Sequence, residues 1–316
     1  MPRPVEDAPL RSRSPMTMAP QRSEPSLAAV VVREARPRQW LKNVLVFAAP
    51  VAAGVLHEWP SLWRAAVAFM AMCAAASGAY FLNDIADVNA DRRHPVKRFR
   101  PVAAGDLPVA TAASLGVGLL VASLALAALT SRWPLVLVVA AYIAVTLAYS
   151  AVLKHIAVVG LAAVAAGFVL RAVAGAVAVD VAMSNWFLLC ISFGSMFIVT
   201  GKRYAELRQF GDDAGSMRPS LENYNVTFLR FIIGASVSIT VVTYCLWAFE
   251  KADVTRVSWP MYQLSIVPVV LGLVRYGLIL ETGRGGAPEE VFLSDRTLQA
   301  VGVVWLALFA LGLYRA

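Results

Sequence analysis

An apolar segment of membrane-spanning length ends in an acidic run and then a basic run, which read Asn83-Asp84-Ile85-Ala86-Asp87-Val88-Asn89-Ala90-Asp91 and Arg92-Arg93-His94-Pro95-Val96-Lys97-Arg98-Phe99-Arg100. At about 3.6 residues per turn, Asn83, Asp87 and Asp91 share one stripe of a helix, and Asp84 lies beside it. Like charges stacked in this way destabilise a bare helix. Mg²⁺ typically binds one or two carboxylates and fills its other positions with substrate phosphates and water. The run therefore predicts a magnesium and diphosphate site at a membrane surface.

The composition of the 316-residue chain is that of a membrane protein, because 59% of the residues are hydrophobic, 15% are charged and the mean hydropathy is +0.65. Soluble proteins average roughly a quarter charged residues. The apolar residues fall into blocks whose length suits a helix that crosses a bilayer. We predict an all-α, polytopic membrane protein with about nine transmembrane helices around a cytoplasm-facing cavity. The predicted spans are Trp40–Val55, Leu62–Ile85, Val109–Leu129, Pro134–Leu153, Val158–Val179, Asn185–Ile198, Phe228–Phe249, Met261–Leu280 and Leu298–Leu313.

Basic residues cluster in alternate connections between the apolar blocks. The N-terminal tail, Arg92 to Arg100 and Lys202 to Arg218 are basic, whereas the connection from His57 to Trp63 carries little net positive charge. By the positive-inside rule, we expect a multi-pass protein of the cell inner (plasma) membrane whose active site faces the cytoplasm. Residues 1–27, rich in Pro, Ser and Arg, are expected to be a disordered cytosolic tail that precedes a transmembrane domain over residues 28–316.

The formal net charge of +8 does not indicate a nucleic-acid-binding face, because the cations lie between apolar blocks rather than on one face of a soluble domain. Membrane topology and phosphate ligands explain them. Cys73, Cys190 and Cys245 lie within apolar blocks and show no paired spacing. We therefore expect no nucleic-acid partner, no disulfide framework and no zinc site.

Further polar residues lie at the ends of the predicted spans. Lys42 opens the first span, Tyr80 lies one turn before the acidic run, and Tyr149 and Lys154 close the fourth span. Each of them also suits an interfacial anchor, because Lys and Tyr are common at membrane surfaces. The cations of the basic run serve as topology determinants and also suit a diphosphate leaving group, whose charge Arg and Lys side chains neutralise.

Arg171 lies well inside an apolar block, where a charged residue is expensive and usually faces a cavity or a partner. Lys202, Arg203 and Glu206 end the sixth span, and this mixture of two cations and one acid suits a second phosphate group better than a metal. The segment weakly repeats the acidic and basic pattern that follows the second span. This repetition predicts two four-helix halves facing one cavity.

Taken together, these residues resemble the UbiA superfamily of intramembrane transferases. Its members share nine transmembrane helices, an N/D-D-x-x-D-x-x-x-D motif and a Y-x-x-x-x-K segment, here Asn83 to Asp91 and Tyr149 to Lys154. The similarity runs from about Arg33 to the end of the chain, and the combination of motifs is more specific than either one. Most members bind a prenyl diphosphate through two aspartate-rich motifs and transfer the prenyl group to an aromatic acceptor.

The chain departs from that pattern at the second motif, where Gly201-Lys202-Arg203-Tyr204-Ala205-Glu206-Leu207 replaces a D-x-x-x-D pair. That segment, together with Arg36 to Asn43 and Asp91 to Pro101, is similar to the decaprenyl-phosphate phosphoribosyltransferase branch of the superfamily. The resemblance implies a magnesium-dependent pentosyltransferase. Such an enzyme transfers 5-phosphoribose from phosphoribosyl diphosphate (PRPP) to decaprenyl phosphate, a polyprenyl phosphate lipid, for arabinogalactan and lipoarabinomannan synthesis in the cell wall.

The resemblance also implies residue roles. Mg²⁺ is expected at Asn83 and Asp87, with Asp84 and Asp91 either as supporting ligands or as residues that contact the ligands, and the three aspartates form the catalytic set. The expected substrate-binding residues are Lys42, Tyr80, Lys97, Arg98 and Arg100 for the donor phosphates, Lys202, Arg203 and Glu206 for the ribose and 5-phosphate, and Tyr149, Lys154 and Arg171 for either the donor or the lipid phosphate.

Two other functions remain open at this point. One is a polyprenyl transferase that acts on an aromatic acceptor in quinone or haem biosynthesis. The other is a transporter whose pathway contains Arg171 and the acidic helix end. The charged positions collect at one membrane face rather than at the midplane, which disfavours the transporter. The sequence leaves the polyprenyl chain length and the oligomeric state open, a homo-oligomer included.

Overall fold

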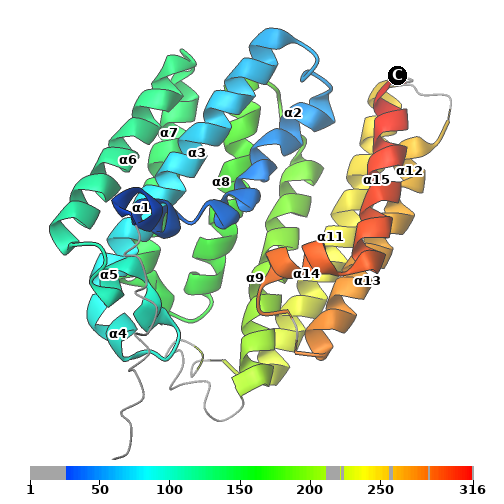
Figure 1. The fold of residues 1–316 in the computed structure, drawn as a ribbon. Helices are drawn as coiled ribbons and strands as arrows, with labels where there is room; N and C mark the ends of the chain where they lie inside the picture. Colours follow the sequence, from blue (N-terminus) through cyan, green and yellow to red (C-terminus); the bar gives the residue numbers. More distant parts are fainter. Residues whose placement is uncertain (1–25, 211–220, 222–223, 256–258, 284, 315–316) are drawn as a thin grey trace, which may run out of the picture.

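The computed structural model describes residues 26–210, 221, 224–255, 259–283 and 285–314, and every regular element within these ranges is a helix (Figure 1). The predicted all-α fold is therefore confirmed. The predicted tail lies outside the described residues except for Ser26 and Leu27, where helix α1 (Leu27–Ala35) begins. The Ser26 hydroxyl accepts a hydrogen bond from the Ala29 N–H at 3.3 Å, which satisfies one of the free donors at the start of α1.

Eight helices within the described ranges are long and apolar enough to cross a membrane, so the chain is a multi-pass integral membrane protein. Six of the eight lie within a few residues of predicted spans. Helix α9 continues to Phe210 instead of ending at Ile198, and α11 continues to Thr255 instead of ending at Phe249, because charged turns can extend beyond the lipid. The helices are α3 (Trp59–Ala86), α6 (Val109–Leu129), α7 (Trp133–Ala151), α8 (Val159–Val179), α9 (Asn185–Phe210), α11 (Val226–Thr255), the pair α12 (Met261–Leu264) and α13 (Ile266–Glu281), and α15 (Arg296–Tyr314).

The first predicted span, Trp40–Val55, is not one α-helix. It forms the 3-10 helix η1 (Pro37–Phe47, 11 residues) and then α2 (Ala48–Ala53, 6 residues). The eight long helices of the described ranges are roughly consistent with the prediction of about nine, and η1 and α2 lie at the position of the first predicted span. The segment packs tightly on α8, because a Cβ at Gly175 would lie 1.7 Å from the Val46 carbonyl oxygen.

The long helices form two four-helix halves, as predicted (Figure 1). Helices α3, α6, α7 and α8 enclose a core that contains Met72, and α9, α11, α13 and α15 enclose a core that contains Tyr276. The halves meet where α8 packs against α9. The segment of η1 and α2 belongs to both, since Val46 lies in the first core and Val51 packs on the aromatic cluster around Trp247.

The connections alternate between the two ends of the bundle (Figure 1). One end carries the acidic motif and the short helices α4 (Val88–Arg93), η2 (Lys97–Phe99), α5 (Pro101–Ala104), η3 (Leu153–His155) and α14 (Pro288–Ser294). The opposite end carries tryptophans at or near the starts of the membrane helices, as an aromatic belt at the lipid surface requires. These side chains are exposed, and they are Trp59, Trp63, Trp133, Trp186 and Trp259.

Candidate active site

The acidic motif lies where α3 ends and α4 begins. Asp87, with φ −93° and ψ 2°, separates the two helices, but the helical hydrogen bonds continue from Asp87 N–H to the Asn83 carbonyl at 2.9 Å and from Asp91 N–H to the Asp87 carbonyl at 2.8 Å. Asp84 and Asp91 are buried, whereas Asn83 and Asp87 are half-buried. The motif thus divides into two pairs. Asp91 lies with Asp84 rather than on the stripe of Asn83 and Asp87, because seven residues are almost two full helical turns.

Two arginines neutralise the buried pair of aspartates. The Arg100 Nη1 donates to Asp84 Oδ1 at 3.0 Å and to Asp91 Oδ2 at 2.6 Å. Arg36 binds the other oxygen of Asp84 and stacks over the Tyr80 ring, with its Cζ 4.9 Å from the ring centroid. Arg36 ends α1 in the left-handed conformation, at φ 53°, which turns the chain from α1 into η1. Arg100 and Arg36 therefore hold the inner face of the motif in place.

Glu34 belongs to the same cluster and was missed by the sequence analysis. It lies on α1 with 1% of its surface exposed. Burial and the adjacent Asp84 carboxylate raise the pKa of the Glu34 carboxyl, Arg36 and Arg100 partly offset them, and the net pKa is about 8. No local signal identifies this residue, because a single glutamate in a short helix usually faces water.

The outer pair of the motif faces the Y-x-x-x-x-K segment. Lys154, in η3 after α7, donates to Asp87 Oδ1 at 2.8 Å. One turn earlier, the Tyr149 hydroxyl accepts a hydrogen bond from Arg203 Nη2 at 3.1 Å. Arg203 also donates to Glu206 Oε2 at 3.0 Å. The predicted residues of α7 and α9 therefore meet across the boundary between the two halves.

The Lys42 ammonium lies in a second cluster that draws on both ends of the chain. It hydrogen-bonds the Gln39 side-chain oxygen and lies 3.8 Å from Glu289 Oε1. The Gln39 amide donates to the same Glu289 oxygen at 2.9 Å. Lys202 and Arg36 are close enough to Lys42 to interact with it electrostatically. Glu289 lies on α14, which the sequence analysis did not predict, because a seven-residue amphipathic turn resembles a loop.

Arg171 uses its donors inside the protein. It is 6% exposed, and its Nε, Nη1 and Nη2 donate to Asn43 Oδ1 at 2.6 Å, the Gly167 carbonyl at 2.7 Å and the Tyr142 hydroxyl at 2.8 Å. Its Cζ also lies 4.7 Å from the Tyr142 ring centroid. The contact with Asn43 attaches η1 to α8 at the residue that follows Lys42. The geometry therefore gives Arg171 a positioning contact, whereas the sequence alone suggested direct contact with a phosphate.

The basic loop adds a small cavity of about 280 Å³ beside the motif. Glu34, Arg36, Lys97 and Arg100 line it. Arg98, in contrast, is exposed and stacks on Phe99, with its Cζ 4.8 Å from the ring centroid. Of the predicted loop residues, Lys97 and Arg100 thus face the motif side, and Arg98 faces solvent.

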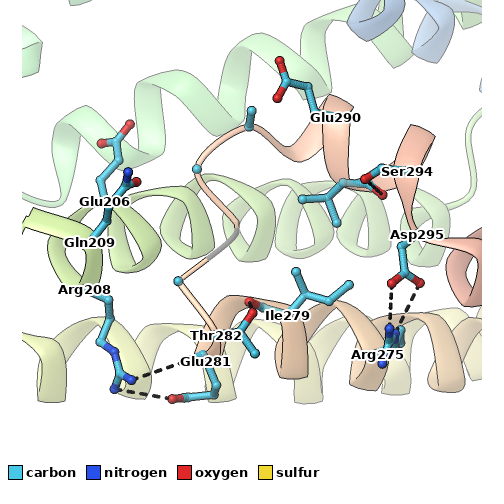
Figure 2. A pocket seen from close by; sticks show the side chains of 14 residues that line it. Glu206, Arg208, Gln209, Arg275, Ile279, Glu281, Thr282, Glu290, Ser294 and Asp295 are labelled. Carbon is cyan, nitrogen blue, oxygen red and sulfur yellow. Dashed lines mark hydrogen bonds and ion pairs between the residues drawn. The ribbon is translucent and has the colours of Figure 1, made fainter.

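A larger cavity, of about 1000 Å³, lies between α9, α13 and α14 (Figure 2). Of the predicted residues only Glu206 lines it. Figure 2 shows two ion pairs on its wall, Arg275 with Asp295 at 2.7 Å and Arg208 with Glu281 at 3.7 Å. With Glu206 and Glu290 added, its carboxylates outnumber its guanidinium groups. This excess of negative charge disfavours a diphosphate, so the anionic substrate site is better placed at the motif.

The motif offers the oxygen ligands that Mg²⁺ prefers. Within the described ranges, no three His, Cys, Asp or Glu side chains converge in the manner of an all-protein metal cage. Asn83 and Asp87 supply an amide and a carboxylate on the half-buried face. A set this small suits Mg²⁺ that shares its coordination with substrate phosphates and water. The residues therefore fit a magnesium ion bound together with a diphosphate.

Comparison with known proteins places this geometry in a family. Residues 44–300 match the UbiA prenyltransferase family. The chain belongs to the UbiA prenyltransferase family. The UbiA homologue of Archaeoglobus fulgidus, solved bound to GPP and Mg²⁺, superposes with a TM-score of 0.67 at 18% identity and covers 90% of this chain and 98% of its own. At this identity the likeness shows a shared UbiA fold.

Two UbiA family relatives are much more similar in sequence. The decaprenyl-phosphate phosphoribosyltransferase of Corynebacterium glutamicum is 42% identical over 292 residues, which cover 92% of this chain and 88% of the relative. The protein of that name from Mycobacterium tuberculosis is 45% identical over 287 residues, which cover 89% of this chain and 93% of the relative. The family resemblance inferred from the motifs is thus confirmed.

Proposed function

We propose that this UbiA family member is a decaprenyl-phosphate phosphoribosyltransferase, which transfers 5-phosphoribose from PRPP to decaprenyl phosphate and releases diphosphate. The observation that carries the proposal is the 42% and 45% identity to enzymes of that name over about nine-tenths of the chain. Its product, decaprenylphosphoryl-5-phosphoribose, would supply cell-wall arabinan synthesis, which includes arabinogalactan and lipoarabinomannan.

The charges at the site support an anionic sugar donor. PRPP carries a diphosphate and a separate 5-phosphate, so it needs more cations than a prenyl diphosphate does. Asn83 and Asp87 would hold Mg²⁺, which when bound would neutralise the departing diphosphate. Lys97, Arg100 and Lys154 surround the motif, while Lys42, Lys202 and Arg203 form the cationic groups at the junction of the two halves.

The reaction needs no strong general base. An oxygen of the acceptor phosphate is already anionic and attacks C1 of the ribose. The bond from C1 to the diphosphate oxygen breaks, and the diphosphate leaves with the electron pair, so no proton is transferred. We infer an oxocarbenium-like transition state and inversion at C1 to the β product. The cations named above would stabilise the charge that develops on the leaving group, which is commonly the largest catalytic effect.

The arrangement of charge also supports an orientation. The motif, the basic loop and Lys154 lie at the end of the bundle opposite the exposed tryptophans. The positive-inside rule then favours a site that faces the cytoplasm from the inner membrane. PRPP would reach that face from water, and decaprenyl phosphate would present its headgroup there with its tail in the bilayer.

Turnover by the purified full chain tests the proposal. The protein in detergent is incubated with labelled PRPP and decaprenyl phosphate, with Mg²⁺ or with a chelator. We expect labelled decaprenylphosphoryl-5-phosphoribose of β configuration only when Mg²⁺ is present. Product from a prenyl diphosphate and an aromatic acid, with none from PRPP, would overturn the assignment in favour of a quinone or haem pathway enzyme. An α-configured product would contradict the inferred single inversion at C1 of the ribose.

A further inference from the structure

Glu289 is the acidic residue that α14 contributes to the cationic cluster between the halves. It lies 3.8 Å from the Lys42 ammonium, and its Oε1 accepts the Gln39 amide at 2.9 Å. The neighbouring Glu290 is exposed and lines the large cavity on the other side of α14 (Figure 2). These two consecutive residues therefore face different surroundings. Of the two, Glu289 faces the cluster around Lys42, where the phosphates of the donor are expected.

The second oxygen of Glu289 lacks a hydrogen bond although it is buried. No described residue donates to Oε2. An unsatisfied buried acceptor is costly, so this oxygen is available to a hydrogen-bond donor that a ligand brings. The side chain as a whole is 17% exposed, and the terminal torsion of a glutamate is broad, so either oxygen can turn toward a ligand.

The surroundings keep this carboxylate charged. Burial raises the pKa of Glu289. Attraction to Lys42, to its own backbone N–H, to the Gln39 amide and to Lys202 outweighs burial, so the net pKa lies below the ordinary value. An ionised carboxylate only accepts hydrogen bonds. It repels phosphate oxygens and attracts hydroxyl groups. A hydroxylated sugar attached to phosphates satisfies both Glu289 and the nearby Lys42 and Lys202.

We propose that Glu289 accepts hydrogen bonds from the ribose hydroxyls of the donor and so selects a sugar diphosphate over a prenyl diphosphate. This inference rests on the proposed function and adds a specificity residue to it. A prenyl diphosphate has no hydroxyl on its chain and would leave the carboxylate unpaired next to an apolar group. Sites built to hydrogen-bond a hydroxyl reject ligands that lack it, because the protein group stays unsatisfied.

Deoxy donors test the proposal. Initial rates are measured with PRPP and with its 2-deoxy and 3-deoxy analogues, for the wild type, Glu289→Gln, Glu289→Ala and the matched control Glu290→Gln. We expect wild type and Glu290→Gln to prefer PRPP over at least one analogue by roughly 10- to 100-fold in kcat/KM, as for hydrogen bonds to a charged group. Glu289→Ala should abolish that preference, and Glu289→Gln should weaken it, mainly through a higher KM for PRPP.

Each other outcome decides against a stated idea. If the Glu289 variants lose activity equally toward all donors, Glu289 serves only to join α14 to η1, and the proposal is wrong. If they keep the wild-type preference, other residues bind the ribose hydroxyls, and the proposal is also wrong. If the wild type does not use PRPP at all, the proposed function itself fails, and the inference fails with it.

Discussion

The Lys154 ammonium lies 2.8 Å from the Asp87 carboxylate, and the two residues are 67 positions apart in the chain. Their side chains are 23% and 28% exposed, so the pair is partly open to solvent. This contact joins the end of α7 to the junction of α3 and α4. It brings a cation and an oxygen ligand to the same place, which is the chemistry that a metal-bound diphosphate requires.

Replacement of Asp87 should remove activity without unfolding the protein. We expect Asp87→Asn to lower kcat by at least about 100-fold, because preorganised charge is commonly worth that much, while thermal stability changes little at this half-exposed position. Magnesium dependence of turnover and melting in detergent measure the two effects. Asp106→Asn is the matched control, since Asp106 pairs with Arg33 on the surface at 2.5 Å. An Asp87→Asn enzyme with wild-type rate would exclude Asp87 as a metal ligand.

Replacement of Arg171 should act mainly through structure. Arg171→Lys keeps the charge but cannot supply donors to Asn43, Gly167 and Tyr142 at once. We expect a loss of stability of roughly 3 kcal/mol, as when a buried charge loses its partners. Because η1 would shift, the KM for PRPP should rise as well. Unfolding in detergent and steady-state kinetics test this. Unchanged stability with a large loss of rate would instead indicate direct contact of Arg171 with a phosphate.

Glu34 should make stability depend on pH. Its pKa is raised from 4.5 to about 8 in the folded protein. The folded protein therefore holds the proton more tightly, so this contribution is complete below about pH 4.5 and is lost as the pH rises through about 8. We expect the melting temperature to fall over this range in the wild type and to fall less in Glu34→Gln. Metal-free protein is used, with the exposed Glu290→Gln as the control. Parallel curves for wild type and Glu34→Gln would contradict the expectation.

Gly175 should not tolerate a side chain. A Cβ there would lie 1.7 Å from the Val46 carbonyl oxygen, so Gly175→Ala must push η1 away from α8. We expect a protein that is poorly folded or melts much lower in detergent. At Gly277 nothing lies within 4 Å of the added Cβ. Gly277→Ala should therefore be neutral or slightly stabilising, because alanine favours a helix by roughly 0.5–1 kcal/mol over glycine. Equal melting of the two variants would show that η1 moves freely.

Several features could be predicted from residue order. The spans Val109–Leu129 and Val159–Val179 follow from runs of apolar residues of bilayer length. The tryptophans at one end follow from the preference of indole for the membrane surface. The motif also follows, since Asn83 and Asp87 are one turn apart on a helix that leaves the membrane. Each of these signals is local and repeats with a known period.

Other features depend on residues that are distant in the chain. Hydropathy indicated a span at Trp40–Val55. In the structure, much of this segment is a 3-10 helix, which packs against the distant Gly175. The sequence showed a charge at Arg171, and only the fold shows that its donors are used by neighbouring helices.

The sequence by itself determined the class of this protein, its membrane helices and the chemistry of its acidic motif, because helical period, hydropathy and ligand type are properties of neighbouring residues. The tertiary structure alone decided which charges meet. It paired Asp91 with Asp84 through Arg100, buried Glu34 beside them and placed Glu289 next to Lys42. The physical reason is that a charge selects its partners by distance after packing, and separation along the chain does not set that distance.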